Sequence, residues 1–412
     1  MTSVSRLAIV ASHPIQYFTP LYRALARDSR LDVHVIFASR IGLEKAFDHE
    51  MGVEVAWATD LVSGYSHEFL PEADTIKRVA FREVDNPSVG AALRGFRPDA
   101  TIIHGYGMMT MLRALAWCRR NRVPAIMTSD SSVHSTGAGF RRVLKLATLP
   151  MLLRQFSAIL TMSDRGETYL ANFRYPRTRM FRAPPMIDQG FWNARKRRCE
   201  ARREARERLD LASGDVVLLC VGKLIPGKRV MDIFEAIRHL GADGPASPRV
   251  RLLVAGDGGQ RAELQAFVAA HGLPARFLGF VNIDALPELY CAADALVHPS
   301  ELEQYGMVVL EAAVLGLPLI LSDRVGAIGA TSIARPGENA ILYPCGDVEA
   351  LSRAIGHLLR HPAELARMGE ASLKISLDHQ GGKSVEGVLG AIRFVTGGER
   401  PRASRDDGNI VA

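Results

Sequence analysis

The sequence has few cysteines, and no two of them are closely spaced. Five cysteines occur in 412 residues, and no Cys-x-x-Cys motif is present. This spacing argues against a disulfide framework, a zinc ribbon and a thioredoxin-like redox centre. Cys220 lies inside the apolar run Val216–Val221 and is interpreted as a buried spectator thiol. The reducing cytoplasm fits this cysteine usage best.

Long hydrophobic runs are absent as well. No stretch of about 18 apolar residues occurs, so no membrane-spanning helix is expected. Residues 1–20 lack the charged-then-apolar pattern of a secretory signal, because the apolar run after Arg6 has only the length of a strand. We therefore expect a cytoplasmic protein, either free or at the inner face of the cytoplasmic membrane.

The chain also lacks the features of a nucleic-acid-binding protein. Its formal net charge is +7, but the interleaved aromatic and basic residues of a single-strand binder and the spacings of zinc fingers are missing. An anionic substrate or a membrane surface explains the positive charge at least as well. No nucleic-acid partner is expected.

What the sequence does contain is a regular alternation of short apolar runs and helical stretches. In the first half, we predict strands at Leu7–Ser12, Val33–Ser39, Val53–Ala58, Ala100–His104, Ala125–Ser129 and Ala158–Ser163. In the second half, we predict strands at Val216–Val221, Arg251–Ala255, Arg276–Phe280, Ala295–His298, Leu319–Ser322 and Ala340–Tyr343. Repeated strand–helix–strand order indicates the α/β class, with parallel sheets covered on both faces. The pattern predicts two successive Rossmann-like, doubly wound domains.

The break between the two domains is predicted near residues 185–200. Arg177–Asp188 is rich in proline and irregular, and Arg195–Arg208 is highly charged, which is typical of a solvated helix after a linker. The C-terminal tail is rich in Arg, Asp, Gly and Ser and is expected to be disordered. The predicted organisation is an N-terminal domain at 1–190, a second domain at 191–375, a helix at 376–396 that packs back on the first domain, and the tail at 397–412.

A turn with two lysines follows the predicted strand Val216–Val221. Gly222 ends this strand, and Lys223 and Lys228 bracket a Gly/Pro turn before the next helix. Ligands bind outside the carboxyl ends of the strands in open α/β sheets, and two ammonium groups beside a helix N-terminus suit a diphosphate. An ordinary strand–turn–helix with solvated lysines is the alternative.

Two glutamates follow the predicted strand Ala295–His298. Glu303 lies in the predicted loop, and Glu311 lies on a helix that starts near Gly306. Carboxylates at this edge of the sheet can hold sugar or ribose hydroxyls, and the first N–H groups of the helix can cap a phosphate. Two surface glutamates at this spacing are the alternative.

The order of these motifs resembles family 4 of the retaining nucleotide-sugar glycosyltransferases, which have the two-domain GT-B fold. The second domain of that family typically reads Gly-Arg-Leu-x-x-x-Lys-Gly, then Gly-x-Gly, then Glu-x7-Glu. The matching residues in this sequence are Gly222, Lys223, Leu224 and Lys228, then Gly256 and Gly258, then Glu303 and Glu311. The resemblance covers about residues 215–350.

The resemblance implies a metal-independent donor site. Lys223 and Lys228 would neutralise the departing diphosphate, and no Asp-x-Asp metal motif occurs. Lys223 replaces the family's arginine and cannot grip a phosphate with two parallel bonds. Glu303 would contact the donor sugar, and Glu311 would contact the ribose. The remaining donor-binding residues would be Gly222, Gly256, Gly258, Tyr305 in place of the more frequent Phe, Gly306, Met307 and Val308. No metal and no cofactor besides the donor substrate are expected.

The first domain follows the family pattern less closely. The loop after its first predicted strand contains no glycine, and His13 and Gln16 there are candidates for contact with acceptor or phosphate. A rigid turn bounded by prolines is the alternative. His104 ends another predicted strand and either binds acceptor or caps the strand. Asp130 stands where relatives often have histidine, as a base or orienting group for the acceptor hydroxyl, unless it forms an Asx turn or helix cap.

Residues 140–154 combine basic residues with leucines and resemble an interfacial amphipathic segment. This pattern predicts peripheral membrane contact. A helix that packs on the sheet with its basic edge in solvent fits as well, and Pro150 interrupts a single long membrane-lying helix.

Together these features predict a retaining glycosyltransferase that moves a sugar from a nucleotide-sugar donor to a glycan or lipid-linked acceptor. Synthesis of bacterial cell-surface polysaccharide, lipopolysaccharide or glycolipid would suit the charge. Two alternatives stay open. A nucleotide-sugar epimerase has a related fold but needs acid–base groups near C2 of the sugar, and a non-catalytic sugar-nucleotide-binding protein would also carry the donor motifs.

Overall fold

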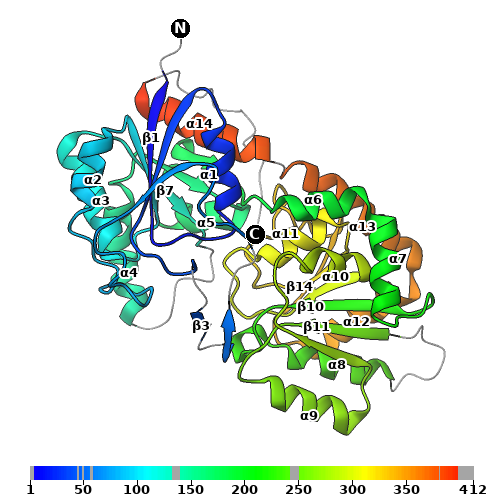
Figure 1. Ribbon diagram of the computed structural model, residues 1–412. Coiled ribbons are helices and arrows are strands. Elements are labelled where there is room, and N and C mark those ends of the chain that lie inside the picture. The colour runs from blue at the N-terminus through cyan, green and yellow to red at the C-terminus, as the bar shows by residue number, and fades with distance from the viewer. Residues whose placement is uncertain are drawn as a thin grey trace.

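Two parallel β-sheets, each flanked by helices, make up the two halves of the molecule (Figure 1). The predicted α/β class with two Rossmann-like domains is confirmed. Of the predicted tail at 397–412, all but Gly397 lies outside the described residues. The computed structural model describes residues 4–43, 46–48, 51–55, 59–131, 140–241, 250–379 and 381–397.

The first sheet has seven strands within the described residues. They are β1 (Ser5–Ala11), β2 (Leu31–Phe37), β5 (Ser66–Phe69), β6 (Ala100–His104), β7 (Ala125–Ser129), β8 (Ala158–Thr161) and β9 (Met180–Arg182). Their order across the sheet is β5-β2-β1-β6-β7-β8-β9, and all of them run parallel. The predicted bounds of β6 and β7 are confirmed. Near-continuous burial along β1, β6 and β8 fits a sheet covered on both faces.

Two predictions for this half are wrong. Val53–Ala58 is predicted as a strand of the parallel sheet, but β4 (Val53–Val55) pairs antiparallel with β3 (Ala46–Asp48) in a separate hairpin. Arg177–Asp188 is predicted as irregular, yet it contains β9, which extends the sheet beside β8. A strand of three residues is too short for its hydrophobic period to be read from the sequence.

The helices of the first domain are fixed by local signals at their ends. Pro20 stands at the start of the first helix, where its missing N–H has no intrahelical partner to lose. Ser163 caps another helix, and its Oγ accepts a hydrogen bond from Gly166 N at 3.2 Å. These helices are α1 (Thr19–Ala26), α2 (Val89–Phe96), α3 (Met109–Asn121), α4 (Phe140–Leu153) and α5 (Asp164–Asn172).

The second sheet has six parallel strands within the described residues. They are β10 (Val216–Val221), β11 (Val250–Ala255), β12 (Ala275–Gly279), β13 (Ala295–His298), β14 (Leu319–Ser322) and β15 (Ala340–Tyr343). The predicted bounds of β10, β13, β14 and β15 are confirmed. The order β12-β11-β10-β13-β14-β15 reverses direction between β10 and β13. Ligands bind at such a switch point in doubly wound sheets.

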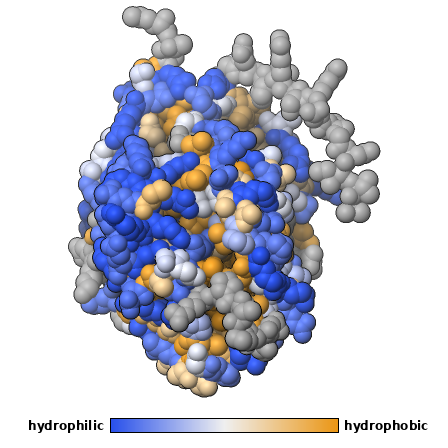
Figure 2. Space-filling model, turned by 90° about the vertical axis from the view of Figure 1, so that its right-hand side faces the viewer, coloured by the Kyte–Doolittle hydropathy of each residue, from blue (hydrophilic) through white to orange (hydrophobic). Residues whose placement is uncertain are grey.

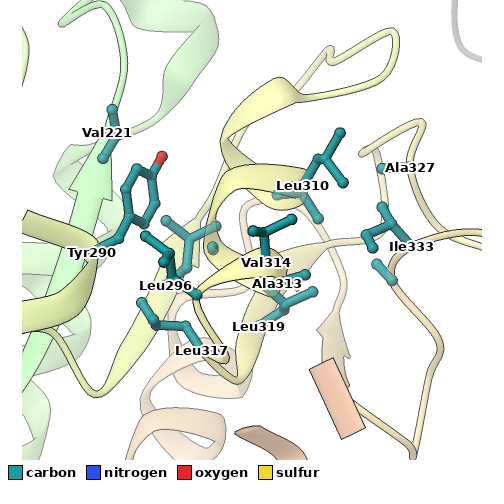
Figure 3. Packing of buried hydrophobic residues seen from close by; sticks show 14 of the residues in the cluster. Val221, Tyr290, Leu296, Leu310, Ala313, Val314, Leu317, Leu319, Ala327 and Ile333 are labelled. Carbon is teal, nitrogen blue, oxygen red and sulfur yellow. The ribbon is translucent and has the colours of Figure 1, made fainter. Parts of the chain in front are cut away.

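The helices of the second half begin with α6 and end with α14. They are α6 (Gln189–Lys196), α7 (Arg198–Arg208), α8 (Met231–Gly241), α9 (Arg261–His271), α10 (Leu286–Ala292), α11 (Met307–Val314), α12 (Val348–Arg360), α13 (Pro362–Leu377) and α14 (Gly381–Thr396). Figure 3 shows side chains of the core that packs β10 and β13 against α10 and α11, among them Val221, Tyr290, Leu296 and Leu310. This core lies directly beneath the carboxyl ends of the strands.

The arginine-rich helix α7 is packed on the domain, so its prediction as a solvated helix is wrong. Arg206 is only 8% exposed, and its guanidinium donates to Asp215 O at 2.7 Å and to Ala292 O at 3.2 Å. Arg202 and Arg206 both contact the carboxylate of Asp294, which also accepts a bond from Val217 N at 2.7 Å. Hydrogen bonds donated by Arg202 and Arg206 attach the helix to the domain in place of the apolar face that the sequence lacks.

Helix α14 returns from the second half to the first. It packs against β8, β9 and α1 (Figure 1). Ser384 Oγ donates to Pro184 O at 2.7 Å. Gly387 passes so close to β9 that a Cβ at this position would lie 2.0 Å from Arg182 O. This contact requires glycine, and it fixes the helix across the connection between the domains.

The region predicted to contact a membrane forms α4, with Pro150 inside the helix. The side chains of residues 140–145 lie outside the description, whereas Leu146 and Met151 are 46% and 68% exposed. Within the described part of the chain, no helix combines the length and apolar character needed to cross a membrane. On the face shown in Figure 2, hydrophilic residues predominate.

Candidate active site

A cavity of about 530 Å³ lies between the two domains, at the carboxyl ends of strands from both sheets. The first domain contributes residues that follow β1, β7, β8 and β9, and the second contributes residues at or after the ends of β10 and β13. From the first domain these are Ile15, Tyr17, Phe18, Asp130, Met162 and Pro185. From the second they are Val221, Gly222, Lys223, Ile225, Lys228, His298 and residues 303–308.

Lys228, Glu303 and the buried His298 form a partly buried cluster in the cavity wall. Lys228 Nζ bonds to Glu303 Oε2, and His298 Nε2 lies 3.1 Å from the same oxygen. Burial alone would raise the pKa of Glu303, but the hydrogen bond and charge of His298, together with the Lys228 ammonium, lower it to about 2. Glu303 is therefore ionised at neutral pH although its side chain is only 19% exposed.

Lys223 contacts the first domain. Its Nζ lies 2.9 Å from Oδ2 of Asp48 on β3, and both side chains are partly exposed. The two lysines predicted from the sequence thus line one cavity, and each bonds to a carboxylate, that of Asp48 or that of Glu303. Lysine ammonium groups beside an open cavity are suited to an anionic ligand.

The backbone around Glu303 is held by close contacts that require glycine. Gly306 has a φ of +94° and directly precedes α11, so the first N–H groups of this helix, at Met307 and Val308, belong to residues of the cavity wall. Gly326 N donates to Glu303 O at 2.8 Å, and a Cβ on Gly326 would lie 1.6 Å from Gln304 O. The loop that carries Glu303 and Tyr305 is therefore packed against a neighbouring turn.

Gly256 and Gly258 do not line this cavity. A Cβ on Gly256 would lie 1.8 Å from Gly222 O, and a Cβ on Gly258 would lie 2.4 Å from Leu224 O. Leu224 N also donates to Asp257 O at 2.8 Å. The Gly-x-Gly motif at the end of β11 thus lets residues 222–224 pass close to its backbone. It helps to position Lys223 and does not itself line the cavity.

Glu311 lies under the cavity wall rather than in it. It is 2% exposed, and it accepts a hydrogen bond from Tyr290 Oη at 2.6 Å. Burial raises the pKa of its carboxyl to about 7, although the bond from Tyr290 acts in the opposite direction. The structure therefore brings Glu303 to the ligand cavity and leaves Glu311 in the layer below.

The predicted acceptor-side histidines lie in the first domain behind the cavity wall. His13 Nδ1 is 2.9 Å from Ser12 Oγ, and His104 Nε2 is 3.1 Å from Tyr22 Oη. Burial lowers the pKa of His13 to about 4 and that of His104 to about 3, so both are neutral at pH 7. Gln16 is 9% exposed. The loop after β1, which carries His13 and Gln16, lines the cavity with Ile15, Tyr17 and Phe18 instead.

Asp130 follows β7 and lines the cavity opposite the lysines. Its side chain reaches solvent. The surrounding chain nevertheless desolvates the carboxyl and raises its pKa, while a backbone hydrogen bond opposes that change. This is the only predicted acceptor-side residue that contributes to the wall, as far as the described residues show.

Contacts between the domains hold the two walls of the cavity together. Arg165 Nη1 at the start of α5 donates to Asp323 O at 2.7 Å and to Val325 O at 2.8 Å. Asp164 Oδ2 accepts a bond from Thr331 N at 2.8 Å. These bonds position the turn that supports the Glu303 loop relative to the first domain.

A larger cavity of about 690 Å³ lies between α1 and α6, and two of the arginines that line it are bonded to backbone carbonyl groups. Arg23 Nη2 donates to Asp60 O at 2.6 Å, and Arg195 Nη2 donates to Leu373 O at 2.9 Å. These arginines tie a loop and a helix end in place. We therefore assign the chemistry to the smaller cavity, where ammonium groups and carboxylates converge.

Sequence reasoning missed several residues at or beside the cavity, among them His298, Tyr17 and Asp48. His298 ends β13 immediately before Pro299, so its position at a strand end was a usable signal. Tyr17 and Asp48 gave no signal, because their place in the site depends on contacts between the domains. Across the described ranges, no group of three or more His, Cys, Asp and Glu side chains has the arrangement of a metal site.

Solved structures share this architecture. HepE from Anabaena, in complex with UDP and glucose, matches 94% of this chain and 99% of its own with a TM-score of 0.68 and 14% identity. Sucrose-phosphate synthase from Thermosynechococcus elongatus matches 96% of this chain and 100% of its own with a TM-score of 0.71 and 18% identity. Two Rossmann-like domains with a ligand cavity between their strand ends define the GT-B class.

Sequence comparison gives the family within that class. Residues 201–374 match the family described as "Glycosyl transferases group 1", and residues 14–185 match the "Glycosyl transferase 4-like domain". The chain belongs to this family of GT-B glycosyltransferases, family 4. The expectation drawn from the motif order is confirmed.

Curated relatives match over shorter stretches. The 2-deoxystreptamine N-acetyl-D-glucosaminyltransferase of Streptomyces fradiae is 33% identical over 208 residues, which are 48% of this chain and 47% of that protein. Glycogen synthase of Mycobacterium tuberculosis (strain H37Rv) is 28% identical over 291 residues, 68% of this chain and 64% of that protein. The chain therefore spans less than two thirds of the length of these relatives.

Proposed function

We propose that this protein is a glycosyltransferase that transfers a sugar from a nucleotide-sugar donor to a glycan or lipid-linked acceptor. One observation carries the proposal. Lys223, Lys228 and Glu303 meet in one cavity that is walled by both domains and lies at the switch point of the second sheet. Family membership and the UDP and UDP-glucose bound to HepE support the same conclusion.

The donor would bind with its diphosphate at the two lysines. Breaking the glycosyl–phosphate bond leaves negative charge on the diphosphate, and preorganised cations stabilise this charge in the transition state. Lys228 and Lys223 supply two such cations, and the first N–H groups of α11 supply aligned dipoles. The proposal needs no metal for this step.

Glu303 would accept hydrogen bonds from hydroxyl groups of the donor sugar. Its ionised carboxylate faces the same cavity as the lysines, and charge-assisted bonds of this kind orient a sugar firmly. In a retaining transfer the acceptor attacks from the face that the phosphate leaves, and that phosphate helps to take the acceptor's proton. Asp130, on the opposite wall, would orient the acceptor hydroxyl.

The acceptor and the setting are proposed from the charge and the surface of the first domain. The positive net charge and the exposed Leu146 and Met151 on α4 support peripheral contact with a membrane through residues 140–154. A lipid-linked acceptor at the cytoplasmic face, in the synthesis of bacterial surface polysaccharide, lipopolysaccharide or glycolipid, fits that surface.

A thermal-shift screen against UDP-, GDP- and ADP-sugars, with and without EDTA, tests the donor site. A ligand at 100 times its Kd stabilises the folded protein by about 2.7 kcal/mol, which is readily measured. We expect the sugars of one of the three nucleotides to raise the melting temperature. This rise should persist in EDTA and disappear in Lys228→Ala. Lys77→Ala, which removes an exposed lysine far from the site in sequence, is the matched control. A folded protein that responds to none of these donors would refute the proposal.

A further inference from the structure

His298 is a buried histidine that ends β13 at the donor cavity. Its side chain is 4% exposed, and its Nε2 lies 3.1 Å from Oε2 of Glu303. The backbone of β13 is paired on both sides, with β10 and with β14, so the imidazole is attached to an interior strand of the sheet. Glu303, in contrast, lies on a loop.

Both partners of the Glu303 carboxylate bond to the same oxygen. Lys228 and His298 meet at Oε2, which directs the carboxylate from two sides. A carboxylate fixed in this way presents its second oxygen, Oε1, to an incoming hydroxyl group. Two donors from two different strand ends determine this orientation more tightly than one could.

We propose that His298 is a positioning residue that holds Glu303 in the orientation needed to bind the donor sugar. The inference rests on the proposed function and adds a residue that the donor motifs do not include. Its physical basis is a competition for Lys228. A bound diphosphate attracts the Lys228 ammonium, which weakens the bond from Lys228 to Glu303. His298 contacts Glu303 and has no role at the phosphate in this proposal. It therefore keeps Glu303 oriented when the Lys228 ammonium turns to the donor.

The same arrangement predicts which part of the donor loses binding affinity when His298 is replaced. The nucleotide and its diphosphate bind at the lysines and at the start of α11, whereas the sugar binds at Glu303. Loss of His298 therefore weakens binding of a nucleotide sugar and leaves binding of the nucleoside diphosphate nearly unchanged. A hydrogen bond to a charged group contributes about 1.5–3 kcal/mol, which corresponds to about 10- to 150-fold in affinity.

Calorimetric titration with UDP and with UDP-glucose tests the inference, with the GDP and ADP pairs in reserve if the wild type prefers another base. His298→Leu removes the hydrogen bond, and His298→Gln keeps an N–H donor at a similar reach. His379→Gln is the matched control, because His379 is also buried, at 5% exposure, but contacts the carbonyl of Ile375 instead of the site. Circular dichroism melts show whether each variant is folded.

We expect His298→Leu to bind UDP as the wild type does and to bind UDP-glucose about 10- to 150-fold more weakly. His298→Gln should recover most of that loss. In a Glu303→Gln background, His298→Leu should have little further effect, because the histidine acts through the carboxylate. A merely structural role for His298 would weaken UDP and UDP-glucose binding alike and would add to the effect of Glu303→Gln.

Two failures are distinguishable. A wild-type protein that binds no nucleotide and no nucleotide sugar refutes the proposed function, and the role of His298 with it. A wild-type protein that binds UDP-glucose more tightly than UDP, with an unchanged difference in folded His298→Leu, refutes only the role of His298.

Discussion

Lys223 of the second domain and Asp48 of the first form an ion pair across the cleft, with 2.9 Å between Nζ and Oδ2. The pair joins a lysine of the proposed donor site to the β3–β4 hairpin, which lies outside both the six- and the seven-stranded sheet. A diphosphate in the cavity would attract the same ammonium group. Donor binding and this contact between the domains are therefore expected to compete for Lys223.

Asp48→Asn should strengthen binding of UDP, because Lys223 then gives up one carboxylate contact fewer when its ammonium group turns to a phosphate. A partly exposed ion pair contributes about 0–1 kcal/mol, so the gain should be at most about fivefold. Isothermal titration of UDP measures it. Asp74→Asn is the control for lost negative charge, since Asp74 pairs with Arg40 on the surface of the same domain. Weaker binding in Asp48→Asn, or an equal gain in Asp74→Asn, would contradict the competition.

Gly326→Ala should displace the loop that carries Glu303, because Gly326 belongs to the turn that packs against this loop. The added Cβ would lie 1.6 Å from Gln304 O, so one of the two backbone segments must move. Forcing extra volume into a packed site costs about 1–3 kcal/mol or more. We expect lower stability in urea unfolding and weaker binding of UDP-glucose. Gly214→Ala, where a Cβ meets nothing within 4 Å, should change neither quantity.

Glu311 should make the stability of the protein depend on pH. Burial raises its pKa from 4.5 to about 7 in the folded chain, so the folded state keeps this proton to higher pH than the unfolded state does. The corresponding stability is complete below about pH 4.5 and is lost as the pH rises through about 7. The total loss is on the order of 3 kcal/mol.

Glu311→Gln removes this dependence while it keeps an acceptor for Tyr290. Its stability relative to the wild type should grow between pH 5 and 7 and stay constant above, as measured by urea unfolding at each pH. Glu349→Gln is the control, because Glu349 is 78% exposed. A stability difference that does not change with pH would show that Glu311 titrates normally in the folded protein.

Arg206→Ala should destabilise the second domain strongly. It removes bonds to three carbonyl oxygens and leaves Asp294, 14% exposed, with one arginine fewer. Breaking a buried charge pair on one side costs about 3–5 kcal/mol. Arg203→Ala changes an exposed arginine on the same helix and should be nearly neutral in thermal unfolding. Equal melting temperatures for the two variants would show that α7 is solvated after all.

The sequence by itself determined the class of fold and most strands of both sheets. Apolar runs such as Ala125–Ser129 and Leu319–Ser322 coincide with β7 and β14, because burial on both faces of a parallel sheet makes a strand continuously apolar. The same local logic located Lys228 and Glu303, since ligand-binding residues follow the strands of an open sheet. Strands of three residues, such as β9, lie below the length at which such a pattern can be recognised.

Only the tertiary structure decided which of these residues meet. Glu303 and Glu311 follow the same strand in sequence, yet one reaches the cavity and the other is buried against Tyr290. The pair of Lys223 with Asp48 joins segments 175 residues apart, and no local pattern encodes it. Periodicity fixes which face a residue occupies within its own element. The packing of one element against another, and of one domain against the other, decides which side chains that residue contacts.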